Sequence, residues 1–271
     1  MSTLKLSAAA LCIAVSLPAS GFAADIKFPT KAPALVAVHN WNGFYAGVNA
    51  GYGWGTSKTD YPGVEPTLFI PGQTFGAIPR SNSPRNAGFI GGVQAGYNWQ
   101  FNSAIAGLEA DFAYTGMRGT ATYAATVFPA PLLTTTQENK LNWFATVRPR
   151  VGMLLTPDFL GYVTGGVAIG GAKAATTVDI APPGSCPLTN GFCSTGSASK
   201  TLVGWTAGLG AEMALAAHWT AKAEYLYYDL GNVSYQVIST ATFGNGGTES
   251  IHADAKFKGH IVRVGLNYSF N

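Results

Sequence analysis

Residues 41–55, "WNGFYAGVNAGYGWG", alternate between two kinds of side chain, and this alternation limits the fold more than any other feature. One set of positions is apolar with aromatic ends: Phe44, Ala46, Val48, Ala50, Tyr52 and Trp54. The other set is small or polar and consists mainly of glycine. A period of two indicates a β-strand. An apolar face opposite a nearly empty one is typical of a barrel wall, with lipid outside and a narrow polar interior.

The composition also indicates that much of the chain lies in lipid. Only 11% of the residues are charged, against about 25% in ordinary soluble proteins. Beyond the N-terminus, no uninterrupted apolar run approaches the ~18 residues that a membrane helix needs. A closed barrel is the other way to satisfy backbone polar groups in lipid. The net charge of +3 is too small to indicate nucleic acid as a partner.

The N-terminus has the features of an export signal. Lys5 precedes an apolar segment from Leu6 to Leu17, and small residues follow Pro18. We expect a signal peptide over residues 1–23, cleaved after Ala23 or Ala24, with a short membrane anchor as the alternative. The predicted domains are the signal peptide (1–23), a periplasmic N-terminal tail (24–40) and an outer-membrane β-barrel domain (41–271).

Two cysteines remain in the mature chain, within the turn-rich stretch "PPGSCPLTNGFCSTGS". An exported chain passes through an oxidising compartment, so we expect a disulfide between Cys186 and Cys193 that closes a short surface loop. The alternative, a metal site, lacks further ligands nearby.

Eight segments have the length and pattern of membrane strands. They lie near residues 42–55, 87–100, 103–116, 140–155, 159–172, 201–215, 218–231 and 259–270. The connections alternate between short turns and long loops, the latter at 56–86, 117–139, 173–200 and 232–258. Bacterial barrels have short periplasmic turns and long extracellular loops. The predicted fold class is therefore all-β, an eight-stranded antiparallel up-and-down transmembrane β-barrel with both termini in the periplasm.

Aromatic residues on the predicted lipid face form two girdles in this assignment. The periplasmic girdle contains Phe44, Trp99, Phe159, Trp219, Tyr268 and Phe270. The outer girdle contains Trp54, Phe89, Tyr114, Trp143, Trp205, Tyr225 and Tyr227. A soluble β-sandwich with a core of aromatic residues is the alternative, but it does not explain the alternating connections.

The same alternation places the strand charges inside the barrel. The predicted lumen network consists of Glu109, Asp111, Arg148, Arg150, Glu212, Lys222, Glu224 and Arg263. Because unpaired buried charges would each cost several kcal/mol, we expect these acids and bases to pair. An eight-stranded interior is about wide enough for its own side chains, so the network argues against a wide pore. Pro149 falls on the lipid face, and because proline has no backbone N–H to donate to the neighbouring strand, we expect a bulge there.

The chain resembles the small outer-membrane β-barrel proteins of alphaproteobacteria, the RopB-like or porin-opacity type, which include haem-binding and surface-antigen members. The motifs are "WNGFYAGVNAGYGWG" (41–55), "GFIGGVQAGYNWQ" (88–100), "FATVRPRVGMLL" (144–155), "YVTGGVAIG" (162–170), "GWTAGLGAEMAL" (204–215) and the closing "HIVRVGLNYSF". The resemblance implies an abundant envelope component with surface loops, sometimes porin-like. This chain departs from the pattern at Pro149 and at its end, where Asn271 follows the aromatic Phe270.

Catalysis is not expected, although His252 and His260 lie near Glu249, Ser250 and Asp254 in the sequence. Haem or a small ligand on the extracellular loops is an alternative, with His252, His260, Tyr61, Tyr123 and Tyr235 as iron contacts, and a narrow porin-like channel is another. The main hypothesis is a barrel without cofactor or metal that contributes to envelope integrity and displays loops for contact or adhesion. Expected partners are outer-membrane lipid and lipopolysaccharide, the barrel-assembly machinery during insertion, and host or environmental surfaces.

Overall fold

The computed structural model describes residues 39–62, 79–126, 132–180, 193–239 and 250–270, and their regular structure is antiparallel β-sheet. The predicted signal peptide, most of the predicted tail and Cys186 lie outside these residues. No helix in the described part of the chain is long and apolar enough to cross a membrane. The strands are β1 (Gly43–Thr56), β2 (Thr59–Asp60), β3 (Ser81–Asn82), β4 (Arg85–Phe101), β5 (Ala104–Thr126), β6 (Leu132–Thr156), β7 (Phe159–Ile180), β8 (Cys193–Ala214), β9 (Trp219–Ser239) and β10 (Ser250–Ser269).

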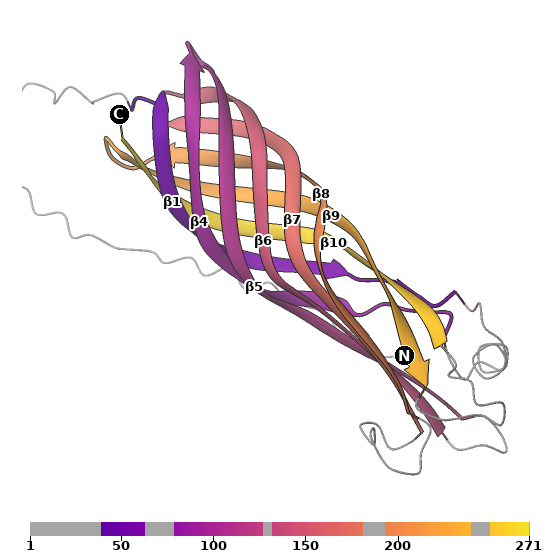
Figure 1. Ribbon diagram of the computed structural model, residues 1–271. Coiled ribbons are helices and arrows are strands. Elements are labelled where there is room, and N and C mark those ends of the chain that lie inside the picture. The colour runs from indigo at the N-terminus through magenta and orange to yellow at the C-terminus, as the bar shows by residue number, and fades with distance from the viewer. Residues whose placement is uncertain (1–38, 63–78, 127–131, 181–192, 240–249, 271) are drawn as a thin grey trace, which may run out of the picture. The chain divides into compact units, whose positions relative to one another are not determined.

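The eight long strands form a closed barrel. Each pairs with its neighbours in the chain, and β1 also pairs with β10, from Tyr45 opposite Ser269 to Gly55 opposite Gly259. Figure 1 shows β1 lying between β4 and β10 in the barrel. Closure leaves no free sheet edge in the part of the barrel where these strands pair. The predicted eight-stranded up-and-down architecture is confirmed.

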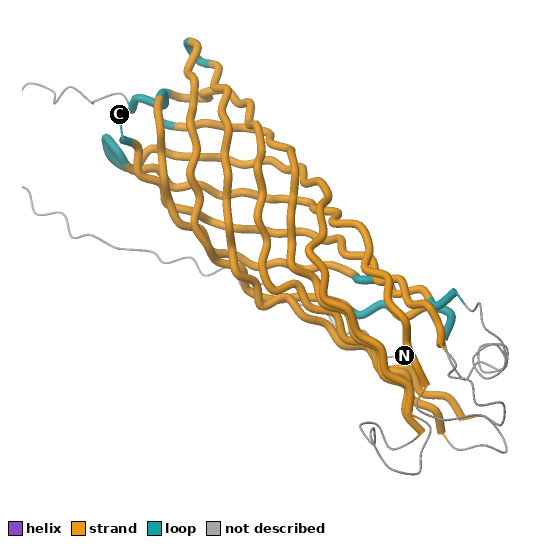
Figure 2. Tube along the Cα trace, in the orientation of Figure 1, coloured by secondary structure: helices purple, strands orange, loops and turns teal. Residues whose placement is uncertain are grey.

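Three short connections lie at one end of the barrel, which we call the turn end (Figure 2). They are residues 102–103, 157–158 and 215–218, as predicted. Asn102 has a φ of 55°, and asparagine tolerates this left-handed conformation better than most residues. The opposite end, which we call the loop end, holds the longer connections.

The predicted loop bounds need correction, because six of the strands, β5 to β10, extend eight or more residues into the predicted loops. Much of the predicted loops 117–139, 173–200 and 232–258 is strand: β5 continues to Thr126, β7 to Ile180 and β9 to Ser239. In the remaining predicted loop, β2 pairs with β10 and β3 pairs with β2, so they continue the barrel wall. We call the part of the wall from Met117, Leu141, Ala172, Leu202, Leu230 and Phe257 outward, with these six residues included, the outer extension.

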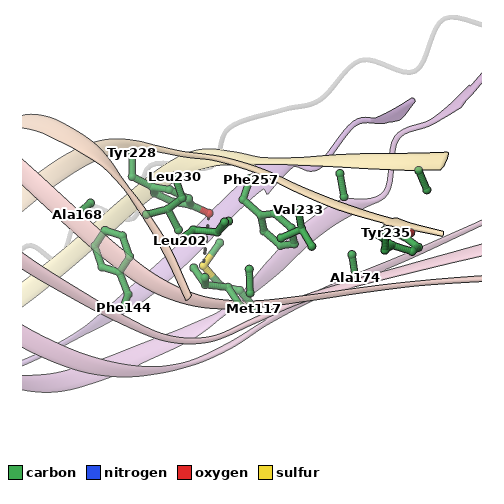
Figure 3. Packing of buried hydrophobic residues seen from close by; sticks show 14 of the residues in the cluster. Met117, Phe144, Ala168, Ala174, Leu202, Tyr228, Leu230, Val233, Tyr235 and Phe257 are labelled. Atoms are coloured by element: carbon green, nitrogen blue, oxygen red, sulfur yellow. Dashed lines mark hydrogen bonds between the residues drawn. The ribbon is translucent and has the colours of Figure 1, made fainter. Parts of the chain in front are cut away.

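The two faces of the wall exchange character at the start of the outer extension. Towards the turn end of β10, Val262 and Val264 are exposed outside and Arg263 is buried inside. In the outer extension Phe257 is buried inside, whereas Lys256 is exposed. Figure 3 shows Met117, Leu230, Val233 and Phe257 among the buried cluster. An apolar outer face is suited to lipid, whereas a polar outer face around an apolar core is suited to water. The exchange therefore marks the level at which the surroundings of the barrel change from lipid to water.

The aromatic residues on the outer face contact one another near both limits of the apolar region. At the turn end the rings of Trp219 and Tyr268 are 5.1 Å apart, and Tyr268 lies 5.2 Å from Phe270. Towards the outer extension the rings of Trp205 and Tyr227 are 5.3 Å apart. These contacts agree with the predicted girdles.

The predicted bulge at Pro149 is wrong. Pro149 faces outward opposite Leu108, and the register between β6 and β7 is unchanged across it. The Thr164 hydroxyl donates a hydrogen bond of 2.9 Å to the Pro149 carbonyl. The Thr164 side chain thus satisfies the carbonyl of Pro149, and β6 continues through the proline without the extra residue that a bulge would insert.

Replacement of Phe257 by alanine tests whether the outer extension has its own apolar core. Because the ring is buried at 1% exposure, the loss in unfolding free energy should be about 3–5 kcal/mol. Urea unfolding of protein folded in detergent micelles, followed by tryptophan fluorescence, measures it. The exposed neighbour is the control, since Lys256→Ala should change stability by less than about 0.5 kcal/mol. Equal effects of the two substitutions would contradict the assigned core.

Candidate functional site

The most unusual feature of the barrel is its charged interior. Alternation along β5, β6, β8, β9 and β10 turns eight ionisable side chains inward, and each residue is at most 5% exposed. They are the four acids Glu109, Asp111, Glu212 and Glu224 and the four bases Arg148, Arg150, Lys222 and Arg263, which we call the lumen cluster. The charges balance, so the interior is polar but formally neutral.

Arg148 lies at the centre of the lumen cluster. Its guanidinium is 2.8 Å from Glu109 Oε1, 3.1 Å from Asp111 Oδ2 and 3.1 Å from Glu224 Oε1. Arg263 joins two of the same acids, with 3.0 Å from Nη1 to Asp111 Oδ1 and 2.7 Å from Nη2 to Glu224 Oε2. Asp111 and Glu224 therefore each have two cationic partners, which stabilise a buried negative charge.

Lys222 shows that the pairs cross the lumen. It lies directly opposite Glu212 in the sheet, yet its Nζ contacts Glu109 Oε1 at 2.7 Å from the other side of the barrel. Glu109 also accepts a hydrogen bond of 2.7 Å from the Tyr45 hydroxyl. Strands that are distant around the sheet are thus joined through the interior.

Arg150 forms a second layer nearer the turn end. It donates to Glu212 Oε2 at 3.0 Å, and its guanidinium carbon is 4.7 Å from the ring centre of Tyr45 and 5.2 Å from that of Tyr162. Glycines lie opposite both tyrosines in the sheet: Gly96 faces Tyr45 and Gly210 faces Tyr162. A Cβ atom at Gly210 would lie 2.5 Å from the Tyr162 ring. This glycine leaves room for a ring inside the barrel, which explains why one face of the strands carries so little side chain.

The turn-end mouth is closed by residues that the sequence analysis did not single out. Trp41 is 3% exposed and its Nε1 donates to the Pro157 carbonyl at 2.9 Å. It packs with Ile105 and Leu160, and the ring of His39 lies 4.7 Å from that of Trp41. His39 lies in the predicted tail and Trp41 at the start of the first motif, and no period of two extends over these residues to indicate that they are buried.

The lumen is also filled towards the loop end. Phe144 and Tyr228, with ring centres 5.3 Å apart, belong to the apolar cluster above the charges. Further out, Gln137 accepts hydrogen bonds from the hydroxyls of Tyr61 at 2.8 Å and Tyr235 at 3.1 Å. Burial raises the pKa of both tyrosines, so they remain neutral donors. Three kinds of layer therefore follow one another along the axis: aromatic, ionic and apolar.

The residues considered for catalysis or iron binding do not converge. His252 is exposed, whereas His260 lies on the outer face with its Nδ1 2.6 Å from the Tyr225 hydroxyl. Tyr61 and Tyr235 point inward, and Tyr123 is 37% exposed. Glu249, Cys186 and the side chain of Cys193 lie outside the described residues. Within the described ranges, no group of three or more His, Cys, Asp or Glu side chains is placed to hold a metal ion.

A closed antiparallel barrel with an apolar outer face, aromatic girdles and a polar interior defines an integral β-barrel of the bacterial outer membrane. Residues 8–270 match the family model described as outer membrane protein beta-barrel domain, and the chain belongs to this family.

Known outer-membrane proteins are similar over most of this chain. The 31 kDa outer-membrane immunogenic protein of Brucella melitensis is 34% identical over 95% of this chain and 97% of its own length. The 22 kDa outer membrane protein of Rhizobium leguminosarum is 28% identical over 78% of this chain and 74% of its own. Among solved structures, outer membrane protease OmpT from Escherichia coli has a TM-score of 0.42 and 10% identity, covering 85% of this chain and 98% of that one. The predicted alphaproteobacterial barrel family and the outer-membrane location are confirmed.

Replacement of Arg148 by alanine should destabilise the barrel strongly. It leaves three buried carboxylates with fewer cationic partners, a loss expected to cost about 3–5 kcal/mol. Urea unfolding in detergent micelles measures it, with the exposed Arg118→Ala as control. The double variant Arg148→Ala/Glu224→Ala should lose less than the sum of the two single losses. Strict additivity would show that the two side chains do not interact.

Proposed function

We propose that this protein is a structural barrel of the outer membrane that contributes to envelope integrity and presents its outer extension for contact or adhesion. The observation that carries the proposal is the filled lumen. The mouth is covered by Trp41, the centre holds balanced ion pairs and the outer half is packed with apolar side chains. Side chains of the described residues occupy the lumen at each of these three levels, so we expect the function to depend on the outer surfaces.

The outer extension supports the second part of the proposal. Its inner face is packed and its outer face is polar, as in a small soluble domain, and residues such as Gln236 and His252 are exposed on it. Loops presented by a rigid scaffold carry contact sites in many proteins. The name of the Brucella relatives, outer-membrane immunogenic protein, is consistent with a chain exposed to the surroundings.

The two other hypotheses have less support. A narrow channel would need a gap through both the ionic and the apolar layers. Haem binding would need a pair of iron ligands facing the same space, but His260 lies on the outer face and Tyr235 on the inner face. Insertion by the barrel-assembly machinery remains part of the proposal.

Recordings in planar lipid bilayers test whether the lumen conducts. The wild type should give no discrete current steps, and Glu109→Ala should give none either, because Phe144 and Tyr228 still close the path above the lumen cluster. A general diffusion porin inserted by the same procedure provides the positive control. Reproducible unitary steps from the wild type would overturn the structural proposal in favour of a channel.

Labelling of intact cells with a membrane-impermeant maleimide tests the display of the outer extension. In a background with Cys186→Ser and Cys193→Ser, the exposed position should be labelled in Gln236→Cys, and the buried neighbouring position should not be labelled in Val237→Cys. Ser103→Cys, in a turn at the opposite end, should react only after the outer membrane is made permeable. Labelling of Ser103→Cys but not Gln236→Cys on intact cells would reverse the assigned orientation.

A further inference from the structure

Three basic residues lie side by side on the outer face where the outer extension begins. Arg118 of β5 is directly opposite Lys140 of β6, and Lys140 is directly opposite Lys173 of β7. Directly opposite residues in an antiparallel sheet have Cβ atoms about 4.5–5.5 Å apart, and like charges at such positions destabilise the sheet. We call these three residues the basic row. Three strands thus carry a repulsive arrangement at one level of the barrel.

Little in the described part of the chain neutralises the basic row. Arg118 and Lys173 are exposed. Lys140 forms an ion pair with Glu138, with 2.7 Å between Nζ and Oε1. Three cations and one acid leave a net charge of +2. The lumen cluster, by contrast, pairs every charge. The basic row therefore has an excess of positive charge that the lumen cluster does not have. This excess is suited to binding an anion from outside the chain.

The level of the basic row identifies the source of that anion. Arg118 follows the exposed girdle residue Tyr114 by four positions in β5, and aromatic girdles lie at the level of lipid headgroups. Basic side chains one step beyond a girdle therefore meet the headgroups themselves, where anionic lipids attract lysine and arginine.

A hollow in the outer face extends the basic surface around the barrel. Arg85 and Lys258 both line it, together with the girdle residues Trp54 and Tyr227, and its volume is about 560 Å³. Arg85 of β4 is directly opposite Thr56 of β1. On the other side of β1, Gly55 is paired with Gly259 of β10, and Lys258 is the residue before Gly259. Arg85 and Lys258 therefore lie on either side of the end of β1. Two cations above an aromatic floor would suit a phosphate group on a lipid whose acyl chains lie against the apolar wall.

We propose that the basic row, with Arg85 and Lys258, binds the phosphate groups of the anionic glycolipid in the outer leaflet. A phosphate bound between neighbouring cations offsets their mutual repulsion, because it attracts each of them. The guanidinium groups of Arg118 and Arg85 can each donate two parallel hydrogen bonds to one phosphate. The inference rests on the proposed function in one respect, because it places the outer extension on the outer-leaflet side. A soluble polyanion is less favoured, since the cations lie beside the lipid face rather than at the tip of the outer extension.

Native mass spectrometry of the full chain, folded in detergent, tests the proposal with bis-phosphorylated lipid A as the probe. The wild type should retain the lipid, and the same lipid without its phosphates should not be retained. The triple variant Arg118→Gln/Lys140→Gln/Lys173→Gln should bind about 100-fold more weakly, since each basic residue near an anionic surface contributes roughly fivefold. Circular dichroism and heat-dependent mobility on gels establish that the variant is folded.

The matched control removes three exposed cations that belong neither to the basic row nor to the lining of the hollow: Lys58→Gln/Arg80→Gln/Lys256→Gln. It should bind lipid A within about twofold of the wild type. Equal losses from both triple variants, or equal retention of dephosphorylated lipid, would overturn the proposal. Binding of heparin without retention of lipid A would also overturn it and would indicate a soluble polyanion. These outcomes are independent of the conductance test, because the basic row lies outside the lumen.

Discussion

The balanced ion pairs inside the barrel are the interaction on which the rest of the structure depends. An outer face in lipid must be apolar, so the alternation of each strand leaves polarity only for the inside. Eight buried charges inside a narrow barrel are tolerable only if they are neutralised together, and Arg148 does this by contacting Glu109, Asp111 and Glu224 at once. Because Lys222 reaches Glu109 across the lumen, the pairing forms only when the barrel is closed.

The outer extension follows from the same rule with the solvent reversed. β9 shows how the chain makes the change: Leu226, Tyr228 and Leu230 point inward, then Val233 and Tyr235 do so after a shift at Gly231, which has a φ of 82°. One extra residue changes which positions face inward, and glycine adopts this backbone conformation easily. β6 has a similar register shift between Leu141 and Trp143. The wall therefore continues beyond the apolar region although its sequence pattern is interrupted.

These shifts explain which features could be predicted from the sequence. The strands within the apolar region, their pairing order and the inward direction of Arg148 and Glu109 follow from one uninterrupted period of two. The outer extension did not follow, because a strand such as β9 loses its period at Gly231 and then exchanges its faces, and both changes resemble a loop. The lumen partner of Lys222 could not be predicted either, since it depends on the distance across the closed barrel. Trp41 lies before the first period and gave no signal, and the hydrogen bond from the Thr164 hydroxyl to the Pro149 carbonyl could not be inferred from the pattern of β6 alone.

A filled barrel could in principle use an apolar core, so the retention of buried ions needs a reason. With apolar residues on both faces, a strand could slip by one residue and expose an equally apolar face to lipid. With Arg148 and Arg150 in β6, the same slip would turn both guanidiniums outward, where a basic residue costs about 2–4 kcal/mol at the membrane midplane. It would also leave Glu109 and Glu212 without these partners. The ion pairs therefore specify the register of the strands as well as closing the lumen, a role that an apolar filling of equal stability would not perform.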